Sequence, residues 1–168
     1  MKKILILNGS PRKNGKTAAL VKAFTEGAES SGNEVKELYL QGMKIGGCLA
    51  CEACSKNGGQ CVQKDDMSKV NEAVEWCDVI VFASPMYWGT ITGQLKITVD
   101  RLYAEFNKLG WGGFNRETAL LMTARGDFYQ QALDFYGIFI NMMNWKNWGT
   151  VLGSEKEDEA RKIGASIN

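Results

Sequence analysis

The chain has 168 residues, 45% of them hydrophobic, and its 20 basic residues nearly balance its 19 acidic ones. This length fits one domain, and the interspersed charges exclude the basic footprint of a nucleic-acid-binding protein. The apolar run Ile4–Leu7 is too short for a secretory signal, and no later run approaches membrane-spanning length, so we expect a cytoplasmic protein without a membrane partner. Because the chain has no histidine, which is the usual general base, we expect its chemistry to depend on a cofactor.

The first half of the chain is predicted to contain two strands and two helices. Lys3–Asn8 is a short apolar run typical of a strand buried on both faces, whereas Glu34–Leu40 mixes charged and apolar residues and is expected at a sheet edge. Apolar residues at helical spacing predict a helix that begins at Thr17 and stops at a Ser-Gly-Asn sequence. A second helix is predicted to be capped by Asp65 or Asp66. Its apolar face carries Met67, Val70, Val74 and Cys77, of which the cysteine is expected to be a buried filler.

The second half continues this alternation. The predicted strands are Val79–Ala83, Ala119–Met122 and Trp148–Leu152. The predicted helices lie at 91–102, at 130–144 and after position 154. Ser154 and Glu157 have the spacing of a capping box, which predicts the start of the last helix.

Five strands that alternate with five helices predict an α/β, doubly wound fold. The second and fifth strands are the least apolar, so they are expected at the edges of a five-stranded parallel sheet of order 2-1-3-4-5, the flavodoxin-like arrangement. Ligands of such sheets bind beyond the carboxyl ends of the strands. The loops 9–17, 84–90 and 123–128 are therefore expected around one crevice, within a single domain that spans 1–168.

The first of these loops, GSPRKNGKT at 9–17, follows a strand and opens a helix, where backbone amides and the helix dipole favour an anion. Ser10, Asn14 and Thr17 add neutral donors, and Arg12 adds a charged fork. The pattern predicts a phosphate site. An ordinary glycine-rich turn with exposed basic residues is the alternative.

A P-loop NTPase is a further alternative, since Ser10–Thr17 reads SxxxxGKT. This differs from the P-loop pattern only at its first glycine, which Ser10 followed by Pro11 replaces with a less flexible sequence. No predicted core strand ends in an aspartate that could help to hold magnesium, because Asp78 stands at the start of its strand. Nucleotide hydrolysis is therefore the weaker interpretation.

Four cysteines lie within the loop 46–62, in the sequence GGCLACEACSKNGGQC. They are Cys48, Cys51, Cys54 and Cys61. Two residues between successive cysteines let thiolates converge on one inorganic centre, and the longer gap allows the chain to turn back and close it. In a reducing cytosol these thiols stay free, which favours metal or redox chemistry over disulfides. An iron–sulfur cluster, bound zinc, and redox-active or vestigial thiols all remain open.

Three sequences occur in one order: GSPRKNGKT, the four-cysteine loop, and SPMYWGTITGQLKITVDRL. In this combination the chain resembles, over essentially its whole length, the NAD(P)H-dependent FMN reductase and iron–sulfur flavoprotein group of flavodoxin-like oxidoreductases. The resemblance implies FMN as cofactor, NAD(P)H as co-substrate and a 4Fe-4S cluster on the four cysteines.

The resemblance also assigns the FMN-binding loops. The phosphate loop corresponds to Ser10, Arg12, Asn14, Gly15, Lys16 and Thr17. The isoalloxazine loop corresponds to Ser84, Pro85, Met86, Tyr87, Trp88 and Gly89, and the loop beside the pyrimidine edge to Thr123, Ala124, Arg125, Gly126 and Asp127. Lys16 differs from the asparagine often found there. Independently, the flat surfaces of Tyr87 and Trp88 suit a planar ring.

We therefore expect an oxidoreductase in which hydride passes from NAD(P)H to FMN, with no catalytic side chain required. Its electrons would leave to a quinone, another small acceptor or a protein electron carrier. The alternative in another class is a non-enzymatic, flavodoxin-like electron carrier. The segment Ala132–Trp148 is too rich in apolar residues for one helix face against one sheet, which predicts a homodimer or a larger homo-oligomer. A substrate pocket lined by this segment, or a deeply buried helix, is the alternative.

Overall fold

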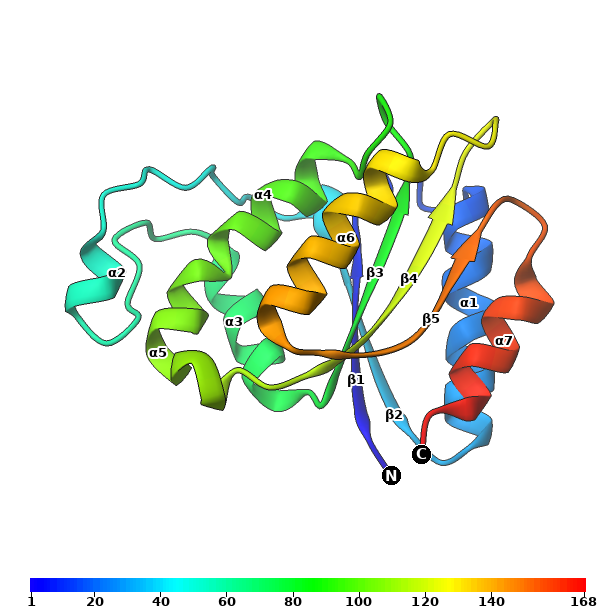
Figure 1. Ribbon diagram of the computed structural model, residues 1–168, viewed down its shortest axis with the longest axis horizontal. Coiled ribbons are helices and arrows are strands. Elements are labelled where there is room, and N and C mark those ends of the chain that lie inside the picture. Colours follow the sequence, from blue (N-terminus) through cyan, green and yellow to red (C-terminus); the bar gives the residue numbers. More distant parts are fainter.

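A computed structural model of the chain describes residues 1–168, apart from the side chains of residues 111 and 112. Its centre is a five-stranded parallel sheet in the order β2-β1-β3-β4-β5, which confirms the predicted topology (Figure 1). The strands are β1 (Lys3–Asn8), β2 (Glu34–Tyr39), β3 (Val79–Pro85), β4 (Glu117–Thr123) and β5 (Lys146–Leu152). All five run in the same direction, so their carboxyl ends share one edge of the sheet.

Helices cover both faces of the sheet (Figure 1). One face is covered by α1 (Lys16–Ser30) and α7 (Glu157–Ser166). The other carries α3 (Met67–Trp76), α4 (Gly93–Arg101), α5 (Tyr103–Gly113) and α6 (Gln130–Met143). The 3₁₀ turn η1 (Leu40–Gly42) and the short α2 (Ala53–Lys56) lie in the connection from β2 to α3.

Alternating side chains of the central strands supply both cores. In β1, Ile4 and Ile6 pack towards the α1 and α7 side, whereas Leu5 and Leu7 belong to the larger core beneath α3, α4 and α6. Both edge strands are partly exposed, as their polar residues predicted. Cys77 is buried as expected, and burial raises the pKa of its thiol to about 12.

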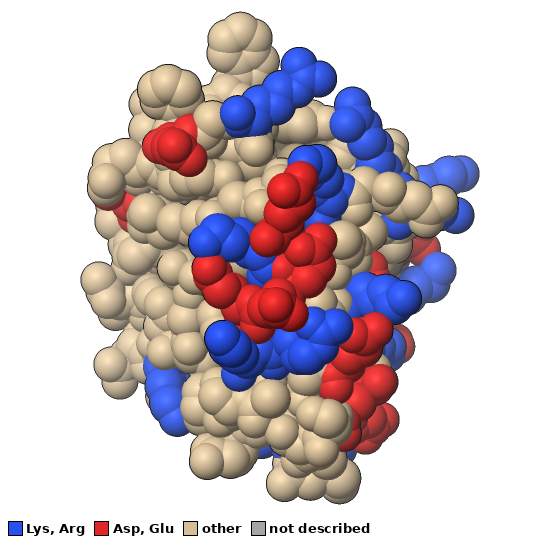
Figure 2. Space-filling model, turned by 90° about the vertical axis from the view of Figure 1, so that its right-hand side faces the viewer, with Lys and Arg blue, Asp and Glu red and all other residues tan. Residues whose placement is uncertain are grey.

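The layer of α1 and α7 is held together by close packing and by charge. A Cβ atom added at Gly27 would lie 2.1 Å from the Arg161 carbonyl oxygen, so the two helices approach to backbone contact. Arg161 also pairs with Glu26 at 2.6 Å. Figure 2 shows acidic and basic side chains interspersed across the middle and right of this side of the molecule, with no large area of one sign, which agrees with the nearly neutral net charge.

One local prediction was wrong: the capping box does not form, because α7 begins at Glu157 after Lys156 and no side chain caps it. The helix predicted at 91–102 is confirmed as α4, but a second helix that was not predicted, α5, follows it directly and ends beyond a kink at Gly110 (φ +72°). Of the two aspartates predicted to cap α3, Asp65 makes the contact: its carboxylate accepts the Met67 amide at 3.1 Å.

Among the described residues, none of the helices combines the length and the apolar character needed to cross a bilayer.

Candidate functional site

A cavity of about 1210 Å³ opens at the carboxyl edge of the sheet. The three predicted loops meet there, together with residues of the β5–α7 loop. Of the predicted residues, the lining includes Ser10, Arg12, Gly15, Lys16, Thr17, Pro85, Met86, Tyr87, Thr123, Ala124, Arg125 and Gly126. The structure thus brings together side chains that are more than 100 positions apart in the sequence.

The phosphate loop is fixed to the sheet at its first residue. Gly9 donates its amide to the Ala83 carbonyl at 2.8 Å, and its own carbonyl accepts the Thr92 hydroxyl at 2.8 Å. A Cβ atom at Gly9 would lie 2.7 Å from both the Leu95 Cβ and the Thr92 Oγ1. Glycine is required here because the loop passes directly against the start of α4.

The loop ends at an uncapped helix start. Gly15 precedes α1 and has no side chain to bind the first-turn amides, which lack partners within a helix. The Thr17 and Thr123 hydroxyls lie 2.8 Å apart and join the first and third loops. Free amides beside hydroxyls and Arg12 make this end of the cavity suited to a phosphate. The Ser10 hydroxyl itself is bonded to the Arg12 backbone.

The second loop presents an apolar wall. Tyr87 and Thr90 exchange backbone hydrogen bonds of 2.8 and 3.1 Å across a tight turn, in which Trp88 (φ +50°) and Gly89 (φ +82°) are both left-handed. Met86 donates its amide to the Thr123 carbonyl at 2.7 Å. The Met86 and Tyr87 amides are therefore already bonded within the protein, so these two residues would offer a bound ring apolar surface rather than backbone donors.

Five predicted residues lie outside the cavity lining: Asn14, Ser84, Trp88, Gly89 and Asp127. Ser84 is fully buried, and its hydroxyl accepts the Thr92 amide at 3.0 Å, so it holds the loop from behind. Trp88 is fully exposed at the tip of its turn and does not supply the flat wall expected of it.

Four lining residues were missed: Pro11, Phe128, Ser154 and Glu155. Glu155 has a left-handed backbone (φ +63°), and its carboxylate lies 3.2 Å from the Lys16 ammonium group. The loop that carries Ser154 and Glu155 follows the last strand, so its place at the carboxyl edge was the available sequence signal.

The four cysteines of the 46–62 loop line a second, small cavity of about 30 Å³. All four are free thiols, and burial raises the pKa of Cys54, with the charges of Cys61, Glu52 and Cys48 acting in the same direction. Among the described side chains, no three ligand residues are arranged to hold one metal ion. Four sulfurs on one cavity are a donor set that suits either an iron–sulfur cluster or zinc.

The backbone around Cys51 is unusual. Ala50 (φ +51°) and Glu52 (φ +55°), its two neighbours, are both left-handed, a conformation that costs energy in residues other than glycine. Further along, Gly59 (φ +85°) packs so closely on α5 that a Cβ atom would lie 2.7 Å from the Ala104 carbonyl oxygen. The surrounding structure therefore holds this loop in one strained shape.

A buried ion pair lies behind the cysteines. Arg101, at the end of α4, forms a fork with both carboxylate oxygens of Asp65, at 2.8 and 3.1 Å. Burial raises the pKa of Asp65, but hydrogen bonds from Arg101 and from backbone amides outweigh it and hold that pKa below its usual value.

The cysteine loop and the large cavity are separate within one chain. The loop starts near the carboxyl end of β2 and then runs away from the cavity to α2, at the far end of the long axis from α1 (Figure 1). Helix α4 lies between them: its N-terminal side reaches the phosphate loop through Thr92, and its last residue reaches the cysteine loop.

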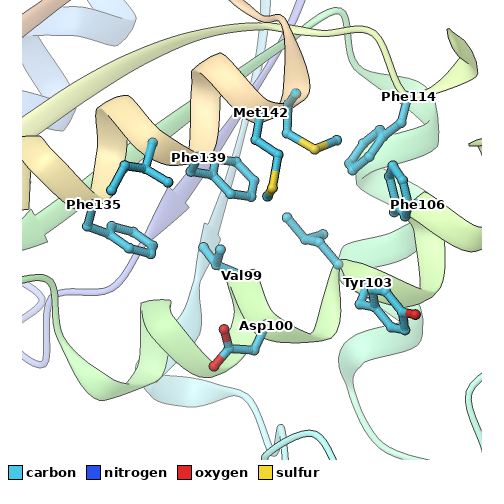
Figure 3. A pocket seen from close by; sticks show the side chains of 11 residues that line it. Val99, Asp100, Tyr103, Phe106, Phe114, Phe135, Phe139 and Met142 are labelled. Carbon is cyan, nitrogen blue, oxygen red and sulfur yellow. The ribbon is translucent and has the colours of Figure 1, made fainter. Parts of the chain in front are cut away.

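An apolar groove of about 410 Å³ lies between α4, α5 and α6. Figure 3 shows Phe135, Phe139 and Met142 facing Val99 and Phe106 across it, with Asp100 at its margin. Ile138 and Met142 are 69% and 57% exposed, whereas Tyr136 and Ile140 of the same helix are buried. The excess of apolar residues noted in the sequence therefore divides between the core and this surface.

The family model described as NADPH-dependent FMN reductase matches residues 2–134. The chain belongs to this family. The match includes both loop motifs, the cysteine loop and the first turn of α6.

Several curated relatives carry the name iron-sulfur flavoprotein. One from Archaeoglobus fulgidus is 39% identical over 102 residues, which are 61% of this chain and 46% of that protein. One from Clostridioides difficile is 29% identical over 154 residues, 90% of this chain and 65% of that protein. The chain spans about half the length of several of these relatives.

Solved structures share the fold. An NAD(P)H:quinone oxidoreductase from Methanothermobacter marburgensis superposes with a TM-score of 0.73 at 20% identity, over 98% of this chain and 94% of that one. An azoreductase from Bacillus anthracis gives a TM-score of 0.75 at 16% identity, over 99% of this chain and all of that one. At these identities the likeness confirms the flavodoxin-like fold.

Proposed function

We propose that this protein is an FMN-dependent oxidoreductase that takes electrons from NAD(P)H and delivers them to a quinone, another small acceptor or an electron carrier. The observation that carries the proposal is the cavity at the carboxyl edge, where an uncapped helix start with basic and hydroxyl side chains adjoins an apolar wall. FMN, when bound, would accept a hydride from the nicotinamide and pass electrons on singly or in pairs.

The chain's own residues would bind and orient the cofactor. The amides before α1, with Thr17 and Arg12, would hold the phosphate, while Met86 and Tyr87 would support the ring. The resemblance also assigns Asn14, Trp88 and Asp127 to the FMN site, but these three residues do not line the cavity. The GxGxxG pattern of a dinucleotide site does not follow β1, which favours FMN over FAD.

Turnover separates this function from its alternatives. Purified protein should contain FMN and should oxidise NADH or NADPH in the presence of a quinone, at a rate proportional to protein concentration. A flavodoxin-like electron carrier would bind FMN but would not be reduced by either nicotinamide. A P-loop NTPase would hydrolyse nucleotide without flavin, and that result would contradict the proposal.

We further propose that the cysteine loop binds a 4Fe-4S cluster through Cys48, Cys51, Cys54 and Cys61. Support comes from four sulfurs on one cavity and from relatives named iron-sulfur flavoproteins. Anaerobic purification followed by iron and sulfide assays tests this; FMN without iron or sulfide would contradict it.

We also propose that the active form is at least a homodimer, located in the cytoplasm. The groove between α4, α5 and α6, with Ile138 and Met142 exposed beside it, is an apolar surface of the kind that a second subunit covers (Figure 3). Light scattering at micromolar concentration should give twice the monomer mass or more. Replacement of Ile138 by Glu should shift the protein towards monomer, whereas a wild-type monomer would contradict the interface.

A further inference from the structure

Arg101 is a basic residue buried beside the cysteine loop. Only 2% of it is exposed, although it stands at the end of α4, which is followed at once by another helix. A guanidinium group carries its charge at every physiological pH, and burying it is costly unless it is fully paired. The hydrogen-bond partners of Arg101 therefore indicate the role of its buried charge.

Those partners tie the two ends of the cysteine loop together. Arg101 Nη1 donates to the Gly46 carbonyl at 2.8 Å, and Nη2 lies 3.4 Å from the Cys61 Sγ, as a donor to sulfur. Asp65, held by the same guanidinium fork, accepts the Gly46 amide at 3.0 Å. One side chain thus contacts the first residue of the loop and its last cysteine.

Two observations indicate a further, anionic partner. The Arg101 Nε is buried and has no hydrogen-bond acceptor among the described residues. On α5, the Asn107 Nδ2 lies 4.0 Å from the Cys54 Sγ, as a second donor towards a cysteine of the same cavity. Donors directed at thiolate sulfur stabilise the negatively charged, thiolate-ligated form of a metal centre.

We propose that Arg101 is a positioning residue for the iron–sulfur centre: it fixes Cys61 for ligation, and its buried charge raises the reduction potential of the bound cluster. This inference rests on the proposed cluster. The cluster gains one negative charge on reduction, and a nearby cation with a hydrogen bond to a ligand sulfur favours that reduced state. Arg101 acts through Cys61 and is not itself a ligand.

The test compares three variants purified anaerobically with their FMN. Arg101→Gln removes the charge, and Arg101→Lys keeps it but cannot form the bidentate fork. Arg116→Gln is the matched control, because Arg116 also donates to a backbone carbonyl, that of Val74, away from the four cysteines. Iron and sulfide content, the rate of iron loss to a chelator, and the cluster potential from a mediated redox titration are measured for each.

Arg101→Gln should lose iron several-fold faster than wild type, and the cluster that remains should have a more negative potential. Arg101→Lys should lose iron faster but keep a potential near that of wild type, and Arg116→Gln should match wild type in both. A structural role alone would leave the potential of the remaining cluster unchanged. An unmoved potential in a loaded Arg101→Gln protein would therefore overturn the electrostatic role.

Failure of the cluster proposal gives a different result. Wild-type protein that contains FMN but never iron would overturn the cluster and, with it, this inference, while leaving the flavin function intact. If Arg101→Gln does not fold, Arg101→Lys decides the positioning role, because iron loss at the wild-type rate would overturn it. Hydrogen exchange of the metal-free proteins adds a readout independent of loading: residues 46–62 should exchange faster in Arg101→Lys than in wild type, and equal exchange would overturn the proposed anchor.

Discussion

The two candidate sites are built in different ways. The loops of the large cavity leave the ends of adjacent strands and are bonded to the sheet and to one another, as Gly9 is to Ala83 and Met86 to Thr123. The cysteine loop leaves an edge strand and crosses the outside of the helical layer, and buried Arg101 with Asp65 holds its two ends. One site is a consequence of the fold, whereas the other depends on a few specific contacts.

This difference should appear in how each site tolerates change. A loop bonded to the sheet keeps its shape without ligand, but it cannot accept added volume. The cysteine loop lies over the surface and accepts added volume at open positions such as Gly47, though not where Gly59 packs on α5, and it needs its ligand or its anchor for a fixed shape. Each of the following changes tests one side of this comparison.

The largest effect is expected from Cys51→Ala. Cys51 lies between two left-handed residues at the centre of the cysteine loop, and its thiolate is one of four proposed ligands. Loss of one ligand should abolish iron binding and the visible absorption of the cluster, while most FMN remains bound because separate loops hold it. Cys77→Ala is the control, since the buried Cys77 lies outside the loop. Loss of FMN in parallel with iron would contradict the independence of the two sites.

A methyl group added to each region gives the sharpest contrast in stability. At Gly9 a Cβ atom would lie 2.7 Å from the Leu95 Cβ, whereas at Gly47 nothing lies within 4 Å. We expect Gly9→Ala to lower the free energy of unfolding by about 1–3 kcal/mol, as overpacking does, and to weaken FMN binding. Gly47→Ala should change stability by less than about 0.5 kcal/mol. Chemical denaturation of both variants measures the difference, and equal effects would contradict the comparison.

The sheet topology and the loops at its carboxyl edge could be predicted from the sequence because the apolar content of each strand indicates whether it lies at the centre or at the edge of the sheet. The continuous apolar runs of β1, β3 and β4 became central strands, and the mixed sequence of β2 became an edge. The motifs that follow these strands therefore had to meet, and 12 of the 17 residues assigned to FMN do line one cavity.

The rest could not be predicted because it depends on tertiary contacts. Glu155 lines the cavity because of the path that the β5–α7 loop takes. Trp88 lies outside the lining, at a left-handed position of its turn. Nothing in the sequence around Arg101 indicated a role for it. Its role became visible only when the structure placed Asp65 and Cys61, 36 and 40 positions away, within reach of its guanidinium group.

Arg12→Ala tests the electrostatics of the large cavity. Arg12 lines the phosphate end, and the charge-assisted hydrogen bond that it would donate to the cofactor is worth about 1–3 kcal/mol. FMN should therefore bind more weakly by that amount in a fluorescence titration, and riboflavin, which lacks the phosphate, should bind equally to both proteins. The control is Arg161→Ala on α7. Equal weakening for FMN and riboflavin would place Arg12 away from the phosphate.

The smallest effect is expected at Glu105 of α5, the helix on which the cysteine loop packs. Glu105 is 2% exposed and its Oε2 has no hydrogen-bond partner among the described residues. Burial, with the nearby charge of Glu75, raises the pKa of its carboxyl above the usual value of 4.5. The folded state therefore binds this proton more tightly than the unfolded state does, so the contribution of Glu105 to stability is fully present below pH 4.5 and is lost as pH rises through its folded-state pKa.

Glu105→Gln removes that charge, so it should raise the free energy of unfolding at pH 7 by about 1 kcal/mol and lose this advantage below the ordinary glutamate pKa. Urea denaturation of both proteins across this pH range gives the two stabilities. Glu159→Gln, on the exposed side of α7, is the control for the substitution itself. If Glu105→Gln were instead less stable than wild type at pH 7, the carboxylate would have a stabilising partner, and the layer beneath the cysteine loop would be as well paired as the sheet beneath the flavin cavity.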